Sequence, residues 1–241
     1  MISDALLDAL AQAIINRTQL PELPAGITVA DAYQHLPELI KRVSASPAGI
    51  KAGITNTDLQ KLFGLEEALI GLLYQNREIK SGDNLVYSPH RLIECEMAIT
   101  FGAGGEPITV GPAIEFVSLD LARPEDMTPG NITLCNLGAD QFIRGEMAAW
   151  GSFDFEALST LEIVATRDGE TLLTTTPMDS LGGPRLAHAW CMAKAKELGY
   201  ALPEGGILLA GTNGSALTGE SGEYAIHFGH LGSIQFTITD R

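Results

Sequence analysis

The stretch Arg91-Leu92-Ile93-Glu94-Cys95-Glu96-Met97-Ala98-Ile99 is a β-prone run that carries two acids at alternate positions. Successive side chains of a strand point to opposite faces, so Glu94 and Glu96 share one face and lie roughly 7 Å apart along it. Cys95 then lies on the other face, which favours a core position for this thiol. Two carboxylates at this spacing repel each other, and the pair therefore needs solvent, a proton or a cation.

A third acid stands in a second apolar run, residues 111–117, where Glu115 interrupts the sequence GPAIEFV. Three carboxylates with no thiol or imidazole set beside them suit a hard, oxygen-loving cation such as Mg²⁺ or Mn²⁺. For Glu94 and Glu96 alone, the solvent-exposed face of a half-buried strand is the simpler explanation. The rest of the chain decides between the two interpretations.

Composition sets the class of protein. The 241 residues include 45% hydrophobic and only 19% charged residues, enough for a substantial core in one large or two modest domains. The formal net charge of −15 disfavours binding to nucleic acid and to anionic membrane surfaces. No apolar run approaches the roughly 20 residues that a membrane-spanning helix requires, and three scattered cysteines suggest reduced, buried thiols. We therefore expect a soluble, cytoplasmic protein.

Residues 1–75 are predicted to form a helical N-terminal portion, because apolar residues recur there at helical spacing after good N-cap residues. Proline is poorly tolerated inside a helix, so Pro37 is expected to kink or interrupt the second helix. The three expected helices are one capped by Ser3 that runs to about residue 17, one capped by Thr28 that runs to about Val43, and a short one from Asn56 or Thr57 to Gly64.

Residues 76–241 are predicted to form a β-rich catalytic core, which we expect to make one structural unit with the N-terminal portion. Short β-prone runs alternate there with Gly, Pro, Asn and Asp, a pattern typical of antiparallel or mixed sheets. Asp168-Gly169 lies between two alternating runs and predicts a hairpin. Residues 181–198 are expected to form a helix, and residues 206–210 and 224–238 to return to strands.

Several short segments together resemble the fumarylacetoacetate hydrolase superfamily, specifically its 2-keto-4-pentenoate hydratase and 4-oxalocrotonate decarboxylase branch. The resemblance extends, with gaps, from about residue 30 to the end of the chain. Its segments are Gly49 to Thr55 (GIKAGIT), Arg91 to Ile99, Pro112 to Glu115 (PAIE), Leu181 to Pro184 (LGGP), Gly206 to Gly211 (GILLAG) and Leu231 to Ile234 (LGSI).

The resemblance implies an α+β fold with a β-rich distorted barrel or roll as its core, N-terminal helices packed outside, a divalent metal at the mouth, and a homo-oligomer. It implies Glu94, Glu96 and Glu115 as the metal ligands. It also implies that Lys51 binds substrate or handles a proton, whereas a glycine-flanked lysine taken alone would be a solvated loop residue.

The loop after residue 210 is a further candidate for substrate binding. Gly211, Thr212 and Asn213 offer backbone N–H groups and a hydroxyl after a strand, which suits a carboxylate-binding loop or a plain turn equally well.

The predicted activity is that of a divalent-metal-dependent lyase on a small 2-oxo or 2-hydroxydienoic acid, in the catabolism of aromatic compounds. Such an acid can chelate the ion, which then stabilises the enolate. Hydration, the family's usual reaction, is the first prediction, and decarboxylation of a 2-oxo acid is the alternative. Leu69, Gly138 and Gly183, however, replace an acid, a serine and a histidine of the hydratase relatives, and these losses favour decarboxylation. The chain could also catalyse hydrolytic C–C cleavage of an acylpyruvate, or be a non-catalytic binding homologue.

Overall fold

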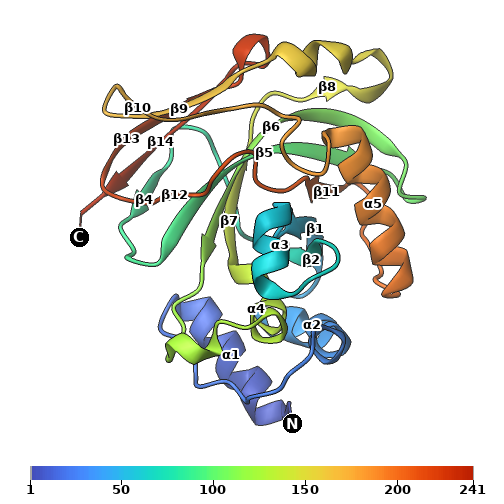
Figure 1. Cartoon of the computed structure of the whole chain (residues 1–241), viewed down its shortest axis with the longest axis vertical. Coiled ribbons are helices and arrows are strands. Elements are labelled where there is room, and N and C mark those ends of the chain that lie inside the picture. Colours follow the sequence, from blue (N-terminus) through green and yellow to red (C-terminus); the bar gives the residue numbers. More distant parts are fainter. Residues whose placement is uncertain (1, 241) are drawn as a thin grey trace.

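Two β-sheets curl around a shared core, and the N-terminal helices lie outside them, in the computed structural model of the chain (Figure 1). The structure describes residues 2–240. This arrangement confirms the predicted α+β class with a curved β-rich core and helices packed against its outside. Within residues 2–240, no helix combines the length and the apolar character needed to cross a membrane.

The larger sheet carries nine strands among the residues described, in the order β2-β1-β11-β5-β6-β7-β3, with β12 added to β5 and β8 to β6. Its centre is the long antiparallel pair β5–β6, whose register runs from Arg91 opposite Ser118 to Phe101 opposite Pro107. The strands are β1 (Pro47–Gly53), β2 (Leu69–Tyr74), β3 (Glu78–Ile79), β5 (Arg91–Phe101), β6 (Pro107–Ser118), β7 (Ala139–Arg144), β8 (Ala148–Ala149), β11 (Gly206–Leu209) and β12 (Leu217–Thr218).

The smaller sheet has the order β10-β9-β13-β14-β4 within the described range and packs on the larger one. Its strands are β4 (Asn84–Val86), β9 (Ile163–Arg167), β10 (Glu170–Thr175), β13 (Gly222–His227) and β14 (Ser233–Thr239). Phe116 of the larger sheet meets Phe236 edge to face, with ring centroids 4.9 Å apart. The predicted hairpin is confirmed: Asp168 and Gly169 both have positive φ, 51° and 82°, as a tight β9–β10 turn requires.

The predicted N-terminal helices are confirmed, with the caps expected from the sequence. Ser3, Thr28 and Asn56 each accept a backbone N–H at the first turn of their helix, and α3 ends at Gly64 with φ 65°. The longer helices in the described chain are α1 (Asp4–Asn16), α2 (Val29–Val43), α3 (Thr57–Phe63), α4 (Pro129–Leu134) and α5 (Pro184–Glu197). The short 3₁₀ turns are η1 (Pro124–Asp126), η2 (Asn136–Gly138), η3 (Trp150–Ser152), η4 (Glu156–Thr160) and η5 (Gly229–Leu231).

Two helix details differ from the expectation. Helix α2 continues through Pro37, and the carbonyl of Tyr33, which Pro37 leaves without its helical donor, accepts the Tyr200 hydroxyl at 3.4 Å. Helix α5 begins at Pro184 and not at Leu181, because Leu181 and the two glycines after it have positive φ angles that a right-handed helix does not admit.

The prediction that residues 1–75 are helical is wrong for two segments, β1 and β2, which join the larger sheet. The sequence of β1, PAGIKAG, lacks the alternation that marks a half-buried strand, because the strand is buried on both faces. Gly49 is needed there, since a Cβ at this position would lie 1.7 Å from the Ile207 carbonyl oxygen. Close approach of β11 to β1 therefore depends on this glycine.

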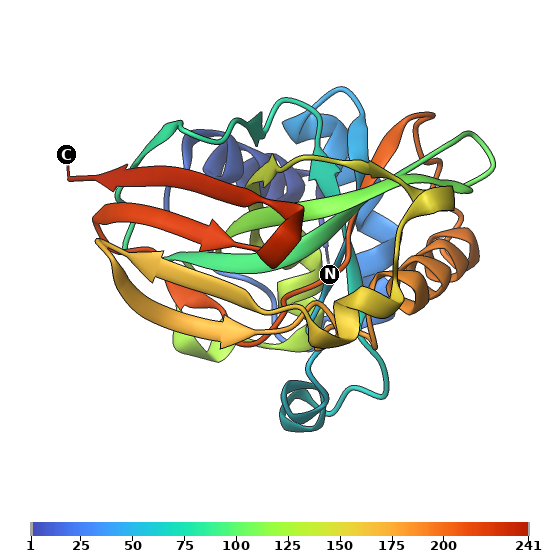
Figure 2. The same ribbon diagram turned by 90° about the horizontal axis from the view of Figure 1, so that it is seen from above.

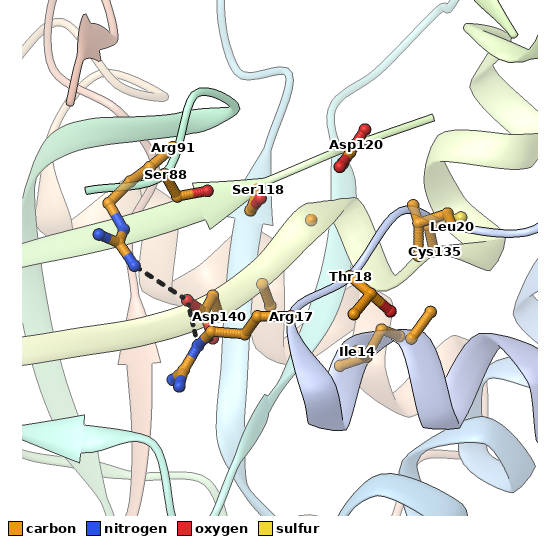
Figure 3. A pocket seen from close by; sticks show the side chains of 13 residues that line it. Ile14, Arg17, Thr18, Leu20, Ser88, Arg91, Ser118, Asp120, Cys135 and Asp140 are labelled. Atoms are coloured by element: carbon orange, nitrogen blue, oxygen red, sulfur yellow. Dashed lines mark hydrogen bonds and ion pairs between the residues drawn. The ribbon is translucent and has the colours of Figure 1, made fainter. Parts of the chain in front are cut away.

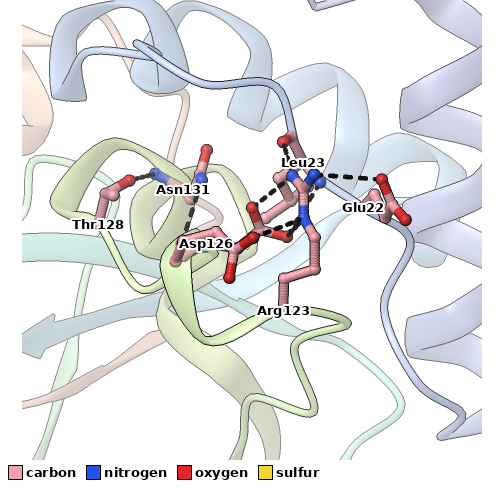
Figure 4. A network of polar contacts seen from close by, with 7 residues as sticks. Glu22, Leu23, Arg123, Asp126, Thr128 and Asn131 are labelled. Carbon is pink, nitrogen blue, oxygen red and sulfur yellow. Dashed lines mark hydrogen bonds and ion pairs between the residues drawn. The ribbon is translucent and has the colours of Figure 1, made fainter.

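The connector between α1 and α2 is fastened to the body by one arginine (Figure 4). Arg123 donates to the carbonyl of Leu23 at 2.6 Å and to Asp126 at 2.7 Å, and it pairs with Glu22 at 3.2 Å. Asp126 in turn accepts the backbone N–H of Leu23 at 3.2 Å. These bonds hold the polypeptide that leaves α1 against η1 and α4.

Candidate metal and substrate site

The three predicted acids converge on one face of the β5–β6 pair. Glu94 lies directly opposite Glu115 in the register, and Glu96 follows Glu94 by two residues on the same face. One carboxylate oxygen from each acid lies within 4.8 Å of those of the other two. The acids are therefore close enough to share one metal ion.

Lys51 reaches this acid cluster from β1, although β11 and β5 stand between β1 and β6 in the sheet. Its Nζ lies 2.8 Å from Glu115 Oε1, and only 1% of the residue is exposed. The curl of the sheet brings the strands together on this face. The interpretation of Lys51 as a solvated loop lysine is wrong.

Burial makes the acid cluster electrostatically strained. Glu96 and Glu115 are buried, and Glu94 is half-buried. Loss of solvation, with the neighbouring carboxylates added, holds the pKa of Glu96 well above its usual range. Burial likewise raises the pKa of Glu115 to about 7, although the Lys51 ammonium opposes this. Burial by itself would lower the pKa of Lys51, but the three carboxylates outweigh it and raise that pKa.

The donor atoms fit a divalent cation. Glu96 Oε2 accepts the Gly211 N–H at 2.6 Å, while Glu96 Oε1 and Glu115 Oε2 are buried and have no hydrogen-bond partner among residues 2–240. A buried carboxylate oxygen without a partner is costly. With all three acids ionised the cluster exceeds the charge of Lys51 by two negative charges, which a divalent ion would balance.

Above the acids lies a cavity of about 460 Å³ to which Lys51 and Glu94 contribute the charged groups of the cluster. His90 and Thr218 are its other polar contributors, and His90 pairs with Asp120 at 3.3 Å. Most of the wall is apolar and includes Leu92, Val117, Leu119, Met127, Ile132 and Leu137. The cavity thus has the shape of a charged floor under apolar walls, as small-molecule sites often do.

Helix α3 projects from the body of the molecule (Figure 2). It lines a second hollow, which shares Glu94 with the first. Leu59 and Leu62 of α3 line this hollow, and they are 45% and 76% exposed. Thr212 also lines this hollow. The acid cluster is therefore open to solvent along Glu94.

The predicted substrate-binding loop has mixed placement. Thr212 lines a hollow beside Glu94, as described, but the other two residues of the loop are buried. Gly211 uses its N–H on Glu96, and a side chain there would meet Ser180 Oγ at 2.5 Å. Asn213 donates its backbone N–H to the Cys95 carbonyl and accepts the N–H of Ser180 at 3.3 Å. Gly211 and Asn213 thus support the cluster from behind.

The positions that depart from the hydratase pattern lie in tight surroundings. Leu69 is buried in β2 and lines a different cavity, between α2 and α5. At Gly138, with φ 70°, a Cβ would meet Leu119 Cγ at 2.9 Å, so a serine would require its neighbours to move. At Gly183, with φ 99°, a Cβ would meet Met178 Sδ at 2.8 Å. The local packing matches the residues that this chain carries.

Sequence reasoning missed the wall of the cavity. Leu92 could have been found, because it alternates with Glu94 and Glu96 on β5 and must share their face. His90 precedes the strand and gives no periodic signal, and Leu137 comes from a distant 3₁₀ turn.

Comparison with known proteins places this site in context. No family model matches the chain. A 2-keto-4-pentenoate hydratase from Burkholderia vietnamiensis is 24% identical over 233 residues, which cover 90% of this chain and 88% of the relative. REH2-associated factor 2 from Trypanosoma brucei brucei is 30% identical over 95 residues, 39% of this chain, and this chain spans only 36% of that protein.

Solved structures superpose on a larger share of this chain than the sequence relatives cover. The 4-oxalocrotonate decarboxylase from Pseudomonas putida G7, complexed with magnesium and adipate, superposes with a TM-score of 0.86 over 99% of both chains at 22% identity. The chain has the fold of the fumarylacetoacetate hydrolase superfamily. The predicted resemblance to the hydratase and decarboxylase branch of that superfamily is confirmed.

A more distant structure shares the fold and also holds a divalent ion. Fumarylpyruvate hydrolase from Pseudomonas aeruginosa, in complex with Mn²⁺ and pyruvate, superposes with a TM-score of 0.59 over 80% of this chain and 89% of the hydrolase, at 13% identity. The P. putida decarboxylase has also been solved with calcium and acetate. Both of these proteins have thus been solved with divalent ions. The acid cluster of this chain has carboxylate oxygens that could hold such an ion.

Proposed function

We propose that the chain is a divalent-metal-dependent lyase that acts on a small 2-oxo or 2-hydroxydienoic acid. The observation that carries this proposal is the convergence of Glu94, Glu96 and Glu115 around buried carboxylate oxygens that lack partners in residues 2–240. In this proposal the three acids hold Mg²⁺ or Mn²⁺ and leave coordination positions for the keto acid. The ion, when bound, supplies Lewis-acid stabilisation of the enolate charge that develops on the substrate.

Lys51 has two tasks in this proposal. Its ammonium lies 2.8 Å from Glu115 and lines the cavity, so it can neutralise the carboxylate or the enolate oxygen of a chelating substrate. Its raised pKa keeps it protonated at neutral pH. It therefore acts as a fixed cation and hydrogen-bond donor. Leu92, Leu119 and Leu137 exclude water from the substrate tail.

Decarboxylation is the reaction that the cavity supports better. The C–C bond to the departing carboxylate breaks, CO₂ leaves, and the electron pair of the bond moves through the conjugated system to the 2-oxygen. A proton from solvent then adds to the resulting dienolate. Among the described residues that line the cavity, Lys51 is the only lysine or arginine, so a carboxylate on the substrate tail would lie against apolar side chains. Poor solvation of that carboxylate favours its loss as CO₂.

Hydration is the second candidate, supported by the sequence likeness to a hydratase over 90% of this chain. It requires a group that moves a proton from water, and the acid and serine of the hydratase pattern are Leu69 and Gly138 here. His90, which lines the cavity and pairs with Asp120, is the residue that we assign to this task if hydration occurs.

Turnover of 2-oxo acids in the presence of Mg²⁺ or Mn²⁺ tests the proposal. We expect a chelator-sensitive loss of dienoate or enone absorbance, with stoichiometric CO₂ release if the reaction is decarboxylation and without it if the reaction is hydration. If no member of a panel of mono- and dicarboxylic 2-oxo acids reacts with either ion, the chain is a non-catalytic binding homologue and the lyase proposal fails.

Replacing the buried cation tests the role of Lys51. We expect Lys51→Met to lower kcat by about 10²–10³-fold while Mn²⁺ still binds, because loss of one preorganised donor removes transition-state stabilisation. Lys61→Met is the matched control, since Lys61 lies on α3 with 77% of its side chain exposed. Steady-state kinetics and calorimetric titration of Mn²⁺ measure the two effects. Equal activity of both variants would remove Lys51 from the mechanism.

A further inference from the structure

A second polar cavity lies on the other side of the β5–β6 pair, beside α1 (Figure 3). Its volume is about 50 Å³. A single water needs roughly 10–15 Å³ of such space, so the cavity has room for a small ion with a water or two but not for a keto acid with a tail. The polar residues around it are Arg17, Thr18, Ser88, Arg91, Ser118, Asp120 and Asp140.

Positive charge is in excess around this cavity. Arg17 and Arg77 bind the carboxylate of Asp140 at 2.9 and 2.6 Å, and Arg91 lies 3.9 Å from it. One carboxylate thus serves three guanidinium groups. The cavity wall itself carries two arginines, Arg17 and Arg91, and two aspartates, Asp120 and Asp140. Arg77, which binds Asp140 from outside the wall, brings the group to one positive charge in excess.

Two of the three arginines are buried. Arg77 and Arg91 are 8% and 4% exposed, and burial lowers the pKa of both guanidinium groups despite the nearby Asp140. Arg77 also donates to the carbonyl of Ile14, and Arg91 to that of Val86. Because a guanidinium in a protein does not give up its proton, the excess charge persists at every physiological pH.

One buried donor that lines the cavity has no hydrogen-bond acceptor in the described part of the chain. Within residues 2–240, the Nε of Arg91 is buried without a hydrogen-bond acceptor. The exposed Thr18 and the half-buried Ser88 and Ser118 line the same cavity. Figure 3 shows Arg91, Ser88 and Ser118 on one side of the cavity and Arg17 and Thr18 on the other, with Asp140 between Arg91 and Arg17. A buried N–H without an acceptor beside an excess of positive charge favours the binding of an anion.

We propose that this cavity binds one small monoanion, of the size of chloride or formate, between Arg17, Arg91 and Ser118. The proposal is independent of the lyase activity. The anion would join α1 to the central strand pair, because Arg17 follows α1 while Arg91 and Ser118 are cross-strand partners on β5 and β6. This pair stands three residues from the Glu94–Glu115 pair, so the anion lies behind the metal site on the opposite face.

Thermal unfolding in mixtures of sodium chloride and sodium gluconate at constant ionic strength tests the proposal. Gluconate is too large for a cavity of about 50 Å³. We expect the Tm to rise with chloride and to saturate, as mass action requires for a single site on the folded state, and formate to act in the same way. A Tm that does not change with the chloride fraction would overturn the proposal.

Variants locate the effect. Arg17→Gln and Ser118→Ala should each weaken the apparent chloride affinity, Arg17→Gln by about tenfold, because a charge-assisted hydrogen bond is lost. Arg144→Gln is the matched control, since Arg144 pairs with Glu78 on β3, away from the cavity. Crystals soaked in bromide should show one anomalous peak between Arg91 and Ser118. Equal chloride affinity of Arg17→Gln and Arg144→Gln, or bromide absent from this cavity, would contradict the site.

Discussion

The acid cluster and the cavity beside α1, here called the arginine cavity because Arg17 and Arg91 line it, are two buried groups of charge. They share one strand pair and differ in sign. Glu94 and Glu115 face each other on β5 and β6, and three residues away Arg91 faces Ser118 on the same strands. The acid cluster has three carboxylates for one lysine, and the cavity has three guanidinium groups around Asp140. In each group, the side chains of one sign are too few to neutralise all the side chains of the opposite sign.

The difference between them lies in how the imbalance can be relieved. A carboxylate can take up a proton, and burial moves the pKa of Glu115 to about 7, close to neutrality. An arginine cannot lose its proton in the same way. The acid cluster therefore responds to pH and to cations, whereas the arginine cavity responds to anions alone. Three changes test this contrast.

Removing the carboxylate of Asp140 from the arginine cavity should have the largest effect, and the effect should be on the free energy of unfolding. We expect Asp140→Asn to lower the free energy of unfolding by about 3–5 kcal/mol, as loss of one partner from a buried ion pair usually does. Urea unfolding measures it. Chloride should recover part of the loss, since a bound anion replaces the carboxylate. Asp58→Asn is the control, because Asp58 forms an exposed pair with Lys61 worth about 0–1 kcal/mol. Equal losses of unfolding free energy in both variants would show that Asp140 does not balance buried positive charge in the cavity.

Removing one carboxylate from the acid cluster should weaken metal binding there without unfolding the chain. We expect Glu115→Gln to weaken Mn²⁺ binding by more than about 100-fold, because loss of a ligand costs more than loss of a supporting partner. Calorimetric titration measures the affinity. Glu106→Gln, an exposed acid in the loop between β5 and β6, should bind Mn²⁺ like the unmodified chain. Full Mn²⁺ affinity in Glu115→Gln would exclude this residue as a ligand.

Changing the pH by a single unit should have the smallest effect, and its sign is opposite for stability and for binding. The pKa of Glu115 is raised from 4.5 to about 7 in the fold, so without metal the folded chain holds more protons than the unfolded chain in this interval. Its stability then falls as the pH rises from about 4.5 to 7. Mn²⁺ affinity rises over the same interval, by about tenfold per pH unit for each proton released.

Titrations of Mn²⁺ in buffers of different ionisation enthalpy count the protons released. We expect net release on binding near pH 6. Mn²⁺ binding that is independent of pH between 5.5 and 7 would show that the acids are already ionised before the metal binds.

The sequence by itself determined the features that depend on local chemistry. Alternation on a strand places Glu94 and Glu96 on one face whatever the rest of the fold does. The caps at Ser3, Thr28 and Asn56 and the turn at Asp168-Gly169 depend on side chains and φ angles a few residues apart. The pairing of Glu115 with these acids came from the family resemblance, and the β5–β6 register explains it.

Only the tertiary structure decided what long-range contacts assemble. Lys51 became a buried partner of Glu115 because β1 is an interior strand of the larger sheet, which its glycine-rich sequence did not indicate. Arg17 and Arg77 meet Asp140 from 123 and 63 residues away, and no periodicity links positions so distant. The excess charge of both clusters is a property of burial, since the same side chains in water would be balanced by solvent and dissolved ions.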